Sequence, residues 1–373
     1  HITQYSMGSD TGDLNNDGLL DLLTTDMTPE DHYRSKTNMA SMSTEAFNSL
    51  FEAGAHRQYM TNTLQINTGL GSFSDIANMA GTAFTDWSWA SLIVDLDNDG
   101  WKDIIIANGI KKDMDNNDFR NTAKNLSENT TAEELFQKSQ EAPSQPISNY
   151  VYKNKGDLQF AKISKDWGFD TPSFSNGMAY GDLDNDGDLD VITNNIDAPA
   201  FVYENKATGN FLKIHLEGSE KNKYGIGAKA IIHHNGKKQI GENTVTRGFL
   251  SSVEHGLFFG LGKDTEVEKI EVHWPNGKTN IFKNISANQV IVADIADAKQ
   301  IKQQKNPVSA LFTKVDNKSI GLDFVHKENE FDDWQEQILL PHRLSQNGPF
   351  SATADVNGDG LGDFFIGGAK DQS

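Results

Sequence analysis

The sequence predicts an all-β fold made of repeated four-stranded units, and three observations support this prediction. An acidic nine-residue pattern occurs four times along the 373 residues. Short runs rich in Val, Ile and Phe flank the copies and are bounded by Gly and Asn, which is typical of strands. Glycine is abundant at 32 residues and proline is sparse at 9, as expected for many short strands joined by glycine turns.

The repeated pattern reads Asp-x-(Asp/Asn)-x-Asp-Gly-x-x-Asp. Its copies begin at Asp13, Asp95, Asp182 and Asp355, so the intervals between them are 82, 87 and 173 residues. The regular spacing indicates a structural repeat, and the doubled last interval indicates an insertion.

The segments around the acidic loops repeat as well. A short β-prone run precedes each loop and an apolar run follows it. A third strand that ends in Asn comes next in three copies (NTLQINTG, NYVYKNKG and AFVYENKA), and two copies continue into a fourth strand (SFSDIANMAG and LQFAKISKDWG). Four strands with the acidic loop between the first two predict β-propeller blades.

Two insertions interrupt the repeats, at residues 28–60 and 111–148. The first contains TEAFNSLFEAG, whose apolar residues share one helical face, and the second contains TTAEELFQKSQ. In the second, Thr130 and Glu133 form a capping-box pattern, which predicts the start of a helix. Insertions of this length are often functional, but simple decoration of the fold is an equally good interpretation.

The acidic loops predict calcium sites. Side chains at positions 1, 3, 5 and 9 converge if the chain coils around a point, the glycine at position 6 permits the turn, and the carbonyl of position 7 adds an oxygen. Hard oxygen ligands without His or Cys favour Ca²⁺ over transition metals, and Mg²⁺ prefers fewer protein ligands. Unmetallated acidic turns are the alternative.

An EF-hand also begins with this pattern, but it requires a bidentate Glu at position 12. Position 12 is occupied here by Thr24, Ile106, Thr193 and Ile366, which lie within the apolar runs. The EF-hand is therefore excluded, and the aspartate at position 9 must complete each site.

The predicted ligand set contains side chains and backbone carbonyls from all four loops. The side chains are Asp13, Asn15, Asp17 and Asp21; Asp95, Asp97, Asp99 and Asp103; Asp182, Asp184, Asp186 and Asp190; and Asp355, Asn357, Asp359 and Asp363. The carbonyls are those of Leu19, Trp101, Asp188 and Leu361. Four bound Ca²⁺ would change the formal net charge from −20 to −12. Because each ligand set lies within one loop, we expect structural rather than catalytic ions.

Composition excludes several classes of protein. A net charge of −20 argues against binding to nucleic acid or to anionic lipid. The absence of cysteine excludes disulfides and thiolate metal sites. No run of 18 apolar residues is present, so we expect no transmembrane segment in this chain.

The loops and strands resemble the FG-GAP/VCBS repeats of integrin-like propellers. The closer similarity is to large surface proteins with an ASPIC/UnbV domain, a group related to cartilage acidic protein. The matching stretches are GDLNNDGLLDLLTTDM, TDWSWASLIVDLDNDGWKDIIIANG and GMAYGDLDNDGDLDVITNN. The segment from GIGAKAIIHHNGKK to FGLGKDTEVEKIEVHWPNGK is similar to the ASPIC/UnbV domain itself.

These features predict three parts. Residues 1–210 are expected to hold the propeller blades, residues 211–295 the ASPIC/UnbV-like β domain, and residues 296–373 the start of a further repeat region. Alternating strands and Asn-Gly turns in the second part independently predict β structure. Because the loops stand in an incomplete register, we expect an internal segment of a longer protein.

The predicted function is that of a non-enzymatic, calcium-stabilised scaffold for protein or glycan partners. The resemblance implies an extracellular or cell-surface location, on a bacterial outer membrane, within a larger surface assembly. The alternative is a polysaccharide-acting enzyme with its site in the propeller channel, where Asp26, Asp86 and Asp113 are the acids to consider. Trp87 and Trp89 are expected to pack between blades, with a sugar-stacking platform as the alternative.

Overall fold

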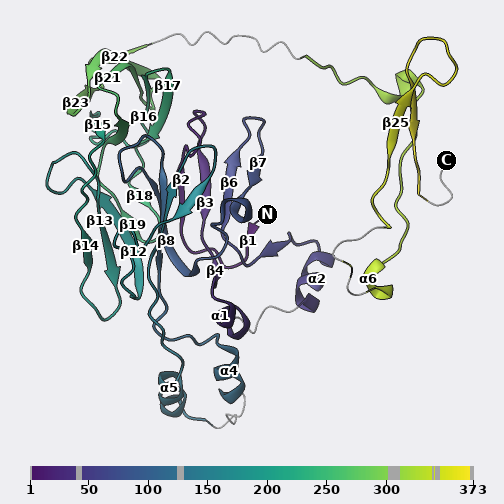
Figure 1. The fold of residues 1–373 in the computed structure, drawn as a ribbon, viewed down its shortest axis with the longest axis horizontal. Coiled ribbons are helices and arrows are strands. Elements are labelled where there is room, and N and C mark those ends of the chain that lie inside the picture. The colour runs from purple at the N-terminus through teal and green to yellow at the C-terminus, as the bar shows by residue number, and fades with distance from the viewer. Residues whose placement is uncertain are drawn as a thin grey trace. The chain divides into compact units, whose positions relative to one another are not determined.

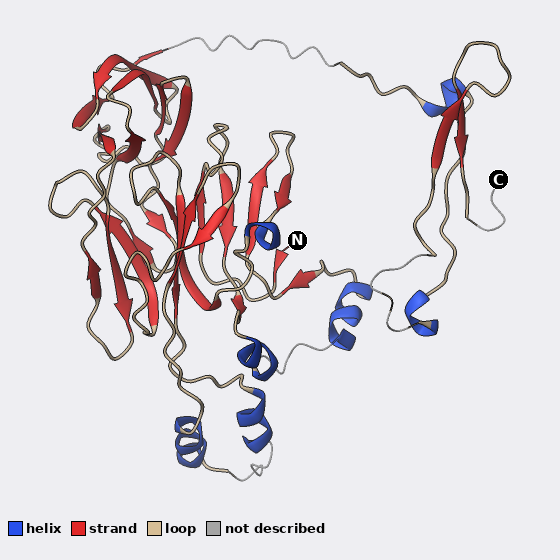
Figure 2. Ribbon diagram, viewed as in Figure 1, coloured by secondary structure: helices blue, strands red, loops and turns tan. Residues whose placement is uncertain are grey.

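The computed structural model describes residues 2–38, 44–123, 130–300, 311–337, 340 and 345–369. It divides into two compact units, residues 1–302 and 303–373. Strands predominate among the described residues and the helices are short (Figure 2). The all-β prediction is therefore confirmed.

The first sheet is an antiparallel meander in the order β2-β3-β6-β7 (Figure 1). Burial alternates along β3, as expected for a strand with one face in a core, and Leu23 is fully buried. The strands are β2 (Ser9–Gly12), β3 (Asp21–Thr24), β6 (Thr63–Asn67) and β7 (Phe73–Asp75).

The second sheet has the order β4-β8-β9-β10-β11 and is also antiparallel. All six residues of β9 are buried, which explains why its sequence is a continuous apolar run and not an alternating one. The strands are β4 (Met27–Thr28), β8 (Asp86–Val94), β9 (Asp103–Asn108), β10 (Tyr150–Asn154) and β11 (Phe160–Lys162).

The third sheet, in the order β12-β13-β14, has three strands among the described residues. In each of the first two sheets, the last strand of the repeat (β7 or β11) begins at a Phe. This Phe lies six residues after the Asn that ends the preceding strand (β6 or β10). Phe211 lies at the same distance after Asn205, but it belongs to β15 (Asn210–Glu217) of another sheet. The strands are β12 (Ser175–Gly181), β13 (Asp190–Asn195) and β14 (Phe201–Tyr203).

Apolar side chains pack between successive sheets. β8 contacts the first strands of both neighbours, β2 and β12. One core cluster joins the first and second sheets and includes Leu64, Ile104 and Tyr152. A second cluster joins the second and third sheets and includes Val151 and Val191.

Two further sheets enclose a separate core that includes Ile214, Ile232 and Phe259. Their orders are β20-β15-β23 and β17-β16-β21-β22-β24, and β15 pairs with β23 in parallel. A short hairpin of β18 and β19 reaches back to the repeats. The strands besides β15 are β16 (Lys229–His234), β17 (Lys237–Glu242), β18 (Thr246–Arg247), β19 (Ser251–Ser252), β20 (Leu257–Gly262), β21 (Glu266–His273), β22 (Lys278–Ser286), β23 (Gln289–Asp294) and β24 (Lys299–Gln300).

Both predicted insertions contain helices (Figure 1). The predicted capping box at Thr130 and Glu133 is wrong by one residue: the Glu134 N–H donates to Thr131 at 3.3 Å, and the Thr131 N–H donates to Glu134 at 2.8 Å. Adjacent threonines and adjacent glutamates make both registers possible in the sequence. The helices are α1 (His32–Thr37), α2 (Thr44–Glu52), α4 (Asn117–Ala123) and α5 (Ala132–Gln140), while α3 (Ala77–Ala80) follows β7 and β1 (Ile2–Thr3) pairs with β5 (Gln58–Tyr59).

None of the helices in the described part of the chain is long and apolar enough to cross a membrane. Residues 39–43 and 124–129 of the two insertions lie outside the described residues.

The second unit contains a hairpin of β25 (Ser351–Ala354) and β26 (Asp363–Ile366) around the fourth acidic loop. It also contains η1 (Asn317–Ile320) and α6 (Asp333–Glu336).

The blade assignment and the division at residues 210 and 295 stay predictions. The sheets have the strand order expected of blades, but those described do not form a closed ring. The repeats and the two sheets that follow them belong to one compact unit.

Candidate metal-binding loops

Each acidic loop connects two adjacent antiparallel strands. The loops lie between β2 and β3, β8 and β9, β12 and β13, and β25 and β26, and the aspartate at position 9 is the first residue of the following strand. The sequence predicted this placement of each loop between two adjacent strands.

The loops coil tightly because two residues in each adopt positive φ. Position 4 is Asn in the first three loops, with φ of 56° at Asn16, 57° at Asn98 and 62° at Asn185, and it is Gly358 in the fourth. The glycine at position 6 has φ between 83° and 96° in all four loops. Asn and Gly are the residues that tolerate this conformation, so the sequence encodes the loop shape locally.

Backbone N–H groups hold three carboxylates of every loop in the same way. The glycine at position 6 donates to position 1, the residue at position 7 donates to position 5, and the residue at position 2 donates to position 9. In the second loop these bonds are Gly100 N–H to Asp95 at 2.8 Å, Trp101 N–H to Asp99 at 2.9 Å and Leu96 N–H to Asp103 at 3.0 Å. The same three bonds recur in the other loops.

In two loops, three carboxylate oxygens lie within 4.8 Å of one another. The groups are Asp95, Asp97 and Asp99 in the second loop and Asp182, Asp184 and Asp186 in the third. Two like charges about 4 Å apart repel by about 4 kcal/mol at an effective dielectric constant of about 20. A cation would remove this repulsion, so both triads could hold a metal ion.

The buried carboxylates fit a cation chemically. Asp95 is 6% exposed, and its Oδ1 has no hydrogen-bond partner among the described residues. Burial, and then repulsion from Asp99, raises the pKa of Asp95 to about 7. Burial likewise raises the pKa of Asp21 to about 6. The raised pKa values mean that the surrounding protein stabilises the charged carboxylates less well than water does. A bound cation would stabilise them, and carboxylate oxygens are the ligands that calcium prefers.

Lysine side chains already supply positive charge to both triads. Lys153 Nζ contacts Asp97 and lies 3.0 Å from Oδ2 of Asp99. Lys213 Nζ lies 3.5 Å from Oδ2 of Asp182 and 2.6 Å from Glu254. A metal ion that enters the second loop must therefore compete with Lys153 for two of its ligands.

The first and fourth loops differ from the second and third because position 3 is an asparagine and not an aspartate. Asn15 Nδ2 donates to Asp17 at 3.0 Å, and Asn357 Nδ2 donates to Asp359 at the same distance. In the exposed fourth loop, the N–H of Gly360 lowers the pKa of Asp355. These two loops carry one acid fewer, and the complete predicted ligand set stays a prediction.

Asp188 has a role beyond the carbonyl that the sequence predicted. Its side chain is buried, and Oδ2 accepts a hydrogen bond from the Ala207 N–H at 2.8 Å. Burial raises the pKa of this carboxyl to about 6. The carboxylate therefore ties the third loop to the segment that follows β14.

The sequence indicated the Asn at the end of each third strand, but not what it does. The N–H groups of Asn67, Asn154 and Asn205 donate to Oδ1 of the position-9 aspartate in their own sheet, at 2.8 to 2.9 Å. Asn154 Nδ2 also donates to the Leu14 carbonyl in the preceding loop at 2.8 Å, and Asn205 Nδ2 donates to that of Leu96 at 2.6 Å. All three asparagines therefore tie a loop to its own sheet, and Asn154 and Asn205 also tie their sheets to the preceding loop.

The Asn at position 4 makes a second link between sheets, which the repeat pattern did not reveal. Asn16 Nδ2 donates to the carbonyl of Gly100 at 3.0 Å, and Asn98 Nδ2 donates to that of Gly187 at 3.0 Å. The first three loops are therefore hydrogen-bonded in series.

This series of links predicts different effects at equivalent positions. Asn98 is buried, whereas Asn185 is exposed and has nearly the same φ. We expect Asn98→Ala to destabilise the fold by about 1–3 kcal/mol more than Asn185→Ala, because it leaves a buried carbonyl unpaired. The measurement is urea unfolding of both variants. Backbone strain is matched between them, so equal losses of stability would contradict the interpretation.

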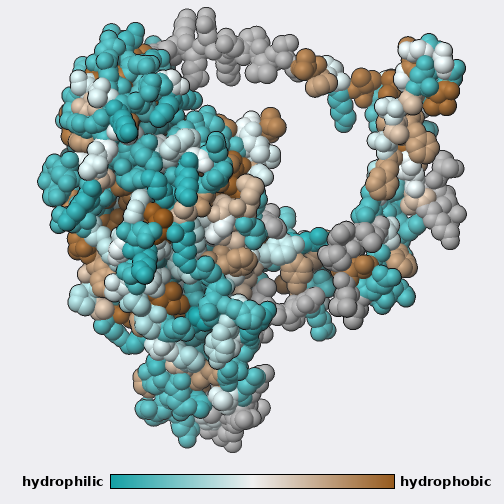
Figure 3. All heavy atoms as spheres, viewed as in Figure 1, coloured by the Kyte–Doolittle hydropathy of each residue, from teal (hydrophilic) through white to brown (hydrophobic). Residues whose placement is uncertain are grey.

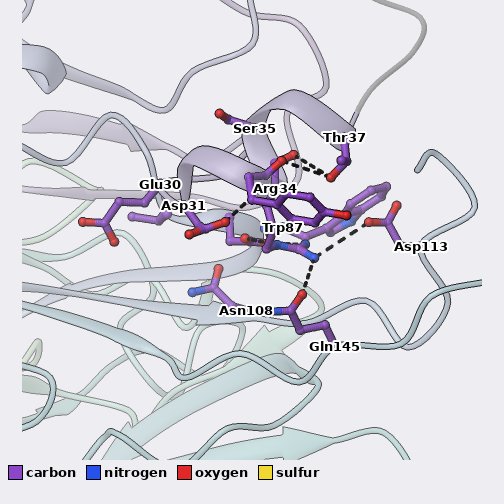
Figure 4. A network of polar contacts seen from close by, with 12 residues as sticks. Glu30, Asp31, Arg34, Ser35, Thr37, Trp87, Asn108, Asp113 and Gln145 are labelled. Atoms are coloured by element: carbon purple, nitrogen blue, oxygen red, sulfur yellow. Dashed lines mark hydrogen bonds and ion pairs between the residues drawn. The ribbon is translucent and has the colours of Figure 1, made fainter. Parts of the chain in front are cut away.

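The acids considered for an enzyme lie outside the loops and are held by the protein. Arg34 in α1 donates two hydrogen bonds to the carboxylate of Asp86, both of 2.7 Å. Its Nη1 also lies 3.9 Å from Asp113, as Figure 4 shows from close by. Asp26 is buried and accepts three backbone N–H bonds. Arg34 thus contacts both Asp86 and Asp113, and neither acid lines the groove described below.

Trp87 and Trp89 pack within the fold. Trp87 is 7% exposed and shares a small cluster with Met27. Trp89 is partly buried, and its ring centre lies 4.9 Å from that of Phe249. Both side chains therefore pack against other parts of the fold, and their packing between blades stays a prediction.

Arg247 joins the β18–β19 hairpin to all three repeat sheets. Its Nε and Nη2 donate to Asp10 at 2.7 and 2.6 Å, and it also contacts the Tyr180 hydroxyl. Nη2 further donates to the carbonyl of Ile93 at 3.1 Å. Both charged groups are nearly buried, with side chains 11% and 3% exposed. No pattern in the sequence indicated this contact, because Arg247 and Asp10 are 237 residues apart.

Comparison with known families gives two matches, one in the repeat sheets and one in the two sheets that follow them. The family described as FG-GAP-like repeat matches residues 53–106 and 142–193, which contain the second and third acidic loops. The family described as ASPIC and UnbV matches residues 218–300, which contain most strands of the two later sheets. No curated protein matches the chain. The chain therefore combines FG-GAP-like repeats with an ASPIC and UnbV domain.

Proposed function

We propose that this chain is part of a calcium-stabilised extracellular or cell-surface protein that binds protein or glycan partners. Its repeats are proposed to be β-propeller blades that each carry a calcium loop. The observation that carries the calcium proposal is the convergence of three carboxylates in the second and third loops. The residues that would hold the ions are those at positions 1, 3, 5, 7 and 9, and bound calcium would neutralise their charge.

The blade proposal is supported by strand order and by the links between loops. The first two sheets contain sequential four-stranded meanders, and the loops of successive sheets are hydrogen-bonded through Asn16 and Asn98. Radial repetition of such sheets is the arrangement of a propeller.

An extracellular location is supported by the chemistry of the loops. Exposed oxygen sites of extracellular modules bind calcium with dissociation constants of about 10⁻⁴–10⁻³ M, which cytosolic calcium would leave empty. On the face of the first unit shown in Figure 3, hydrophilic side chains predominate and hydrophobic ones form small patches.

A non-enzymatic role remains our proposal. The polysaccharide-acting alternative needs two carboxylates that face a substrate cleft. Asp86 instead accepts two hydrogen bonds from Arg34. Both carboxylate oxygens of Asp26 accept hydrogen bonds from backbone N–H groups. No contact in the described residues specifically favours the enzyme hypothesis.

Calcium titration calorimetry tests the proposed function. We expect the chain to bind about four Ca²⁺ with weaker binding of Mg²⁺, and we expect the Asp97→Asn/Asp99→Asn variant to lose about one site. The charge-matched control is Glu133→Gln/Glu204→Gln, which changes two exposed acids outside the loops. Unchanged stoichiometry in the loop variant would contradict the assignment. Protease accessibility on intact producing cells then tests the location.

A further inference from the structure

Side chains at the start of β11, the fourth strand of the second repeat, pack into the core between the first and second sheets. Phe160, the first residue of β11, and Leu158, two residues before it, pack against the core cluster. This cluster contains Leu14, Ile104 and Tyr152. The side chains of this segment thereby extend the apolar core between the two sheets.

The equivalent space between the second and third sheets is a groove of about 660 Å³. Leu96, Val191 and Tyr203 line it, at the repeat positions that Leu14, Ile104 and Tyr152 hold in the first space. The residues equivalent to Leu158 and Phe160 are Gly209 and Phe211, and the chain there turns away into β15. The groove therefore marks the position of a fourth strand that the third sheet lacks within the described part of the chain.

The walls of the groove suit an extended peptide. β14 is the edge strand of the third sheet among the described residues, and its Val202 is 64% exposed. An edge strand offers unpaired backbone N–H and C=O groups to an added strand. Trp167 and the stacked pair Phe169 and Tyr203, whose ring centres are 4.1 Å apart, add aromatic surface.

We propose that the groove binds an extended segment of a partner polypeptide, which adds a fourth strand beside β14. The segment carries an aliphatic residue and, two positions later, an aromatic residue, as Leu158 and Phe160 do in the second sheet. A groove of this volume lies in the range of about 300–1,000 Å³ that is typical of ligand sites. Asp97, Asp166 and Lys153 at its rim place both signs of charge beside the apolar floor. This inference rests on the proposed binding function and names its partner chemistry.

The probe is the chain's own fourth strand, supplied as a synthetic peptide with the sequence of residues 157–164, DLQFAKIS. In 2 mM calcium, we expect saturable binding by calorimetry. We also expect slower hydrogen exchange at the amides of residues 201–204, because an added strand pairs with β14. A peptide with Leu158→Gln and Phe160→Gln is expected to bind at least tenfold more weakly.

The matched protein variants are Ala207→Trp, which fills the groove, and Ala132→Trp, which places the same side chain on exposed α5. Ala207→Trp is expected to weaken peptide binding at least tenfold, and Ala132→Trp is expected to leave it unchanged, with thermal unfolding confirming that both variants fold. Absence of binding, binding without protection of residues 201–204, or binding of glycans alone in the groove would overturn the proposal. Normal calcium stoichiometry in the same samples would show that only this inference had failed.

Discussion

Removal of calcium with EGTA is expected to lower the melting temperature of the first unit by about 3–10 °C. A site with a dissociation constant of about 10⁻⁴–10⁻³ M gains roughly 0.6–2 kcal/mol in 2 mM calcium. Three such loops lie in this unit of residues 1–302, and each kcal/mol changes the melting temperature of a domain of this size by roughly 1.5–2 °C. Differential scanning calorimetry with and without EGTA measures the effect.

Two controls separate calcium from general ionic effects. Magnesium at the same concentration is expected to restore little of the loss, because it prefers fewer protein ligands and more water. The Asp97→Asn/Asp99→Asn variant is expected to show a smaller EGTA effect than the wild type. Equal melting temperatures in calcium and in EGTA would refute structural calcium binding by these loops.

Replacement of Arg247 by alanine is expected to destabilise the first unit by about 3–5 kcal/mol, the usual cost of leaving a buried charge without its partner. The charge left behind is that of Asp10, whose side chain is 3% exposed. The substitution also removes the bond to Ile93 and the contact with Tyr180, so three sheets lose a common anchor. Urea unfolding followed by circular dichroism measures the loss.

The double variant Arg247→Ala/Asp10→Asn is expected to recover part of this stability, because it removes the unpaired charge. Arg120→Ala serves as a control: Arg120 pairs with Asp115 at 3.3 Å, but both side chains are about 40% exposed, so we expect a change within about 0.5 kcal/mol. A loss below about 1 kcal/mol for Arg247→Ala would show that the buried pair contributes little.

The four acidic loops could be predicted because their determinants are local. Each loop is encoded within nine residues, and the backbone shape follows from Asn or Gly at position 4 and Gly at position 6. The strands on either side could be predicted for the same reason, since burial follows the short apolar runs. The helix start at Thr131 was misplaced by one residue because two registers of the capping pattern overlap.

Long-range contacts could not be predicted from these patterns. Trp167 is isolated in the sequence, yet it lines the groove between the second and third sheets. Phe211 repeats the spacing of Phe73 and Phe160, but it lies in β15 of a different sheet. Spacing shows where a strand begins and does not show which neighbour it pairs with.

Local sequence patterns were enough to predict the all-β class, the acidic loops and the placement of each loop between two strands. The folded structure was needed to show which asparagine amides link one sheet to the next and which buried acid Arg247 neutralises. It was also needed to show which groove lacks a fourth strand within the described residues. This difference follows from the range of the interactions. Turn geometry and strand burial depend on residues close in sequence, whereas pairing of charges and sheets depends on segments that meet only when the chain folds.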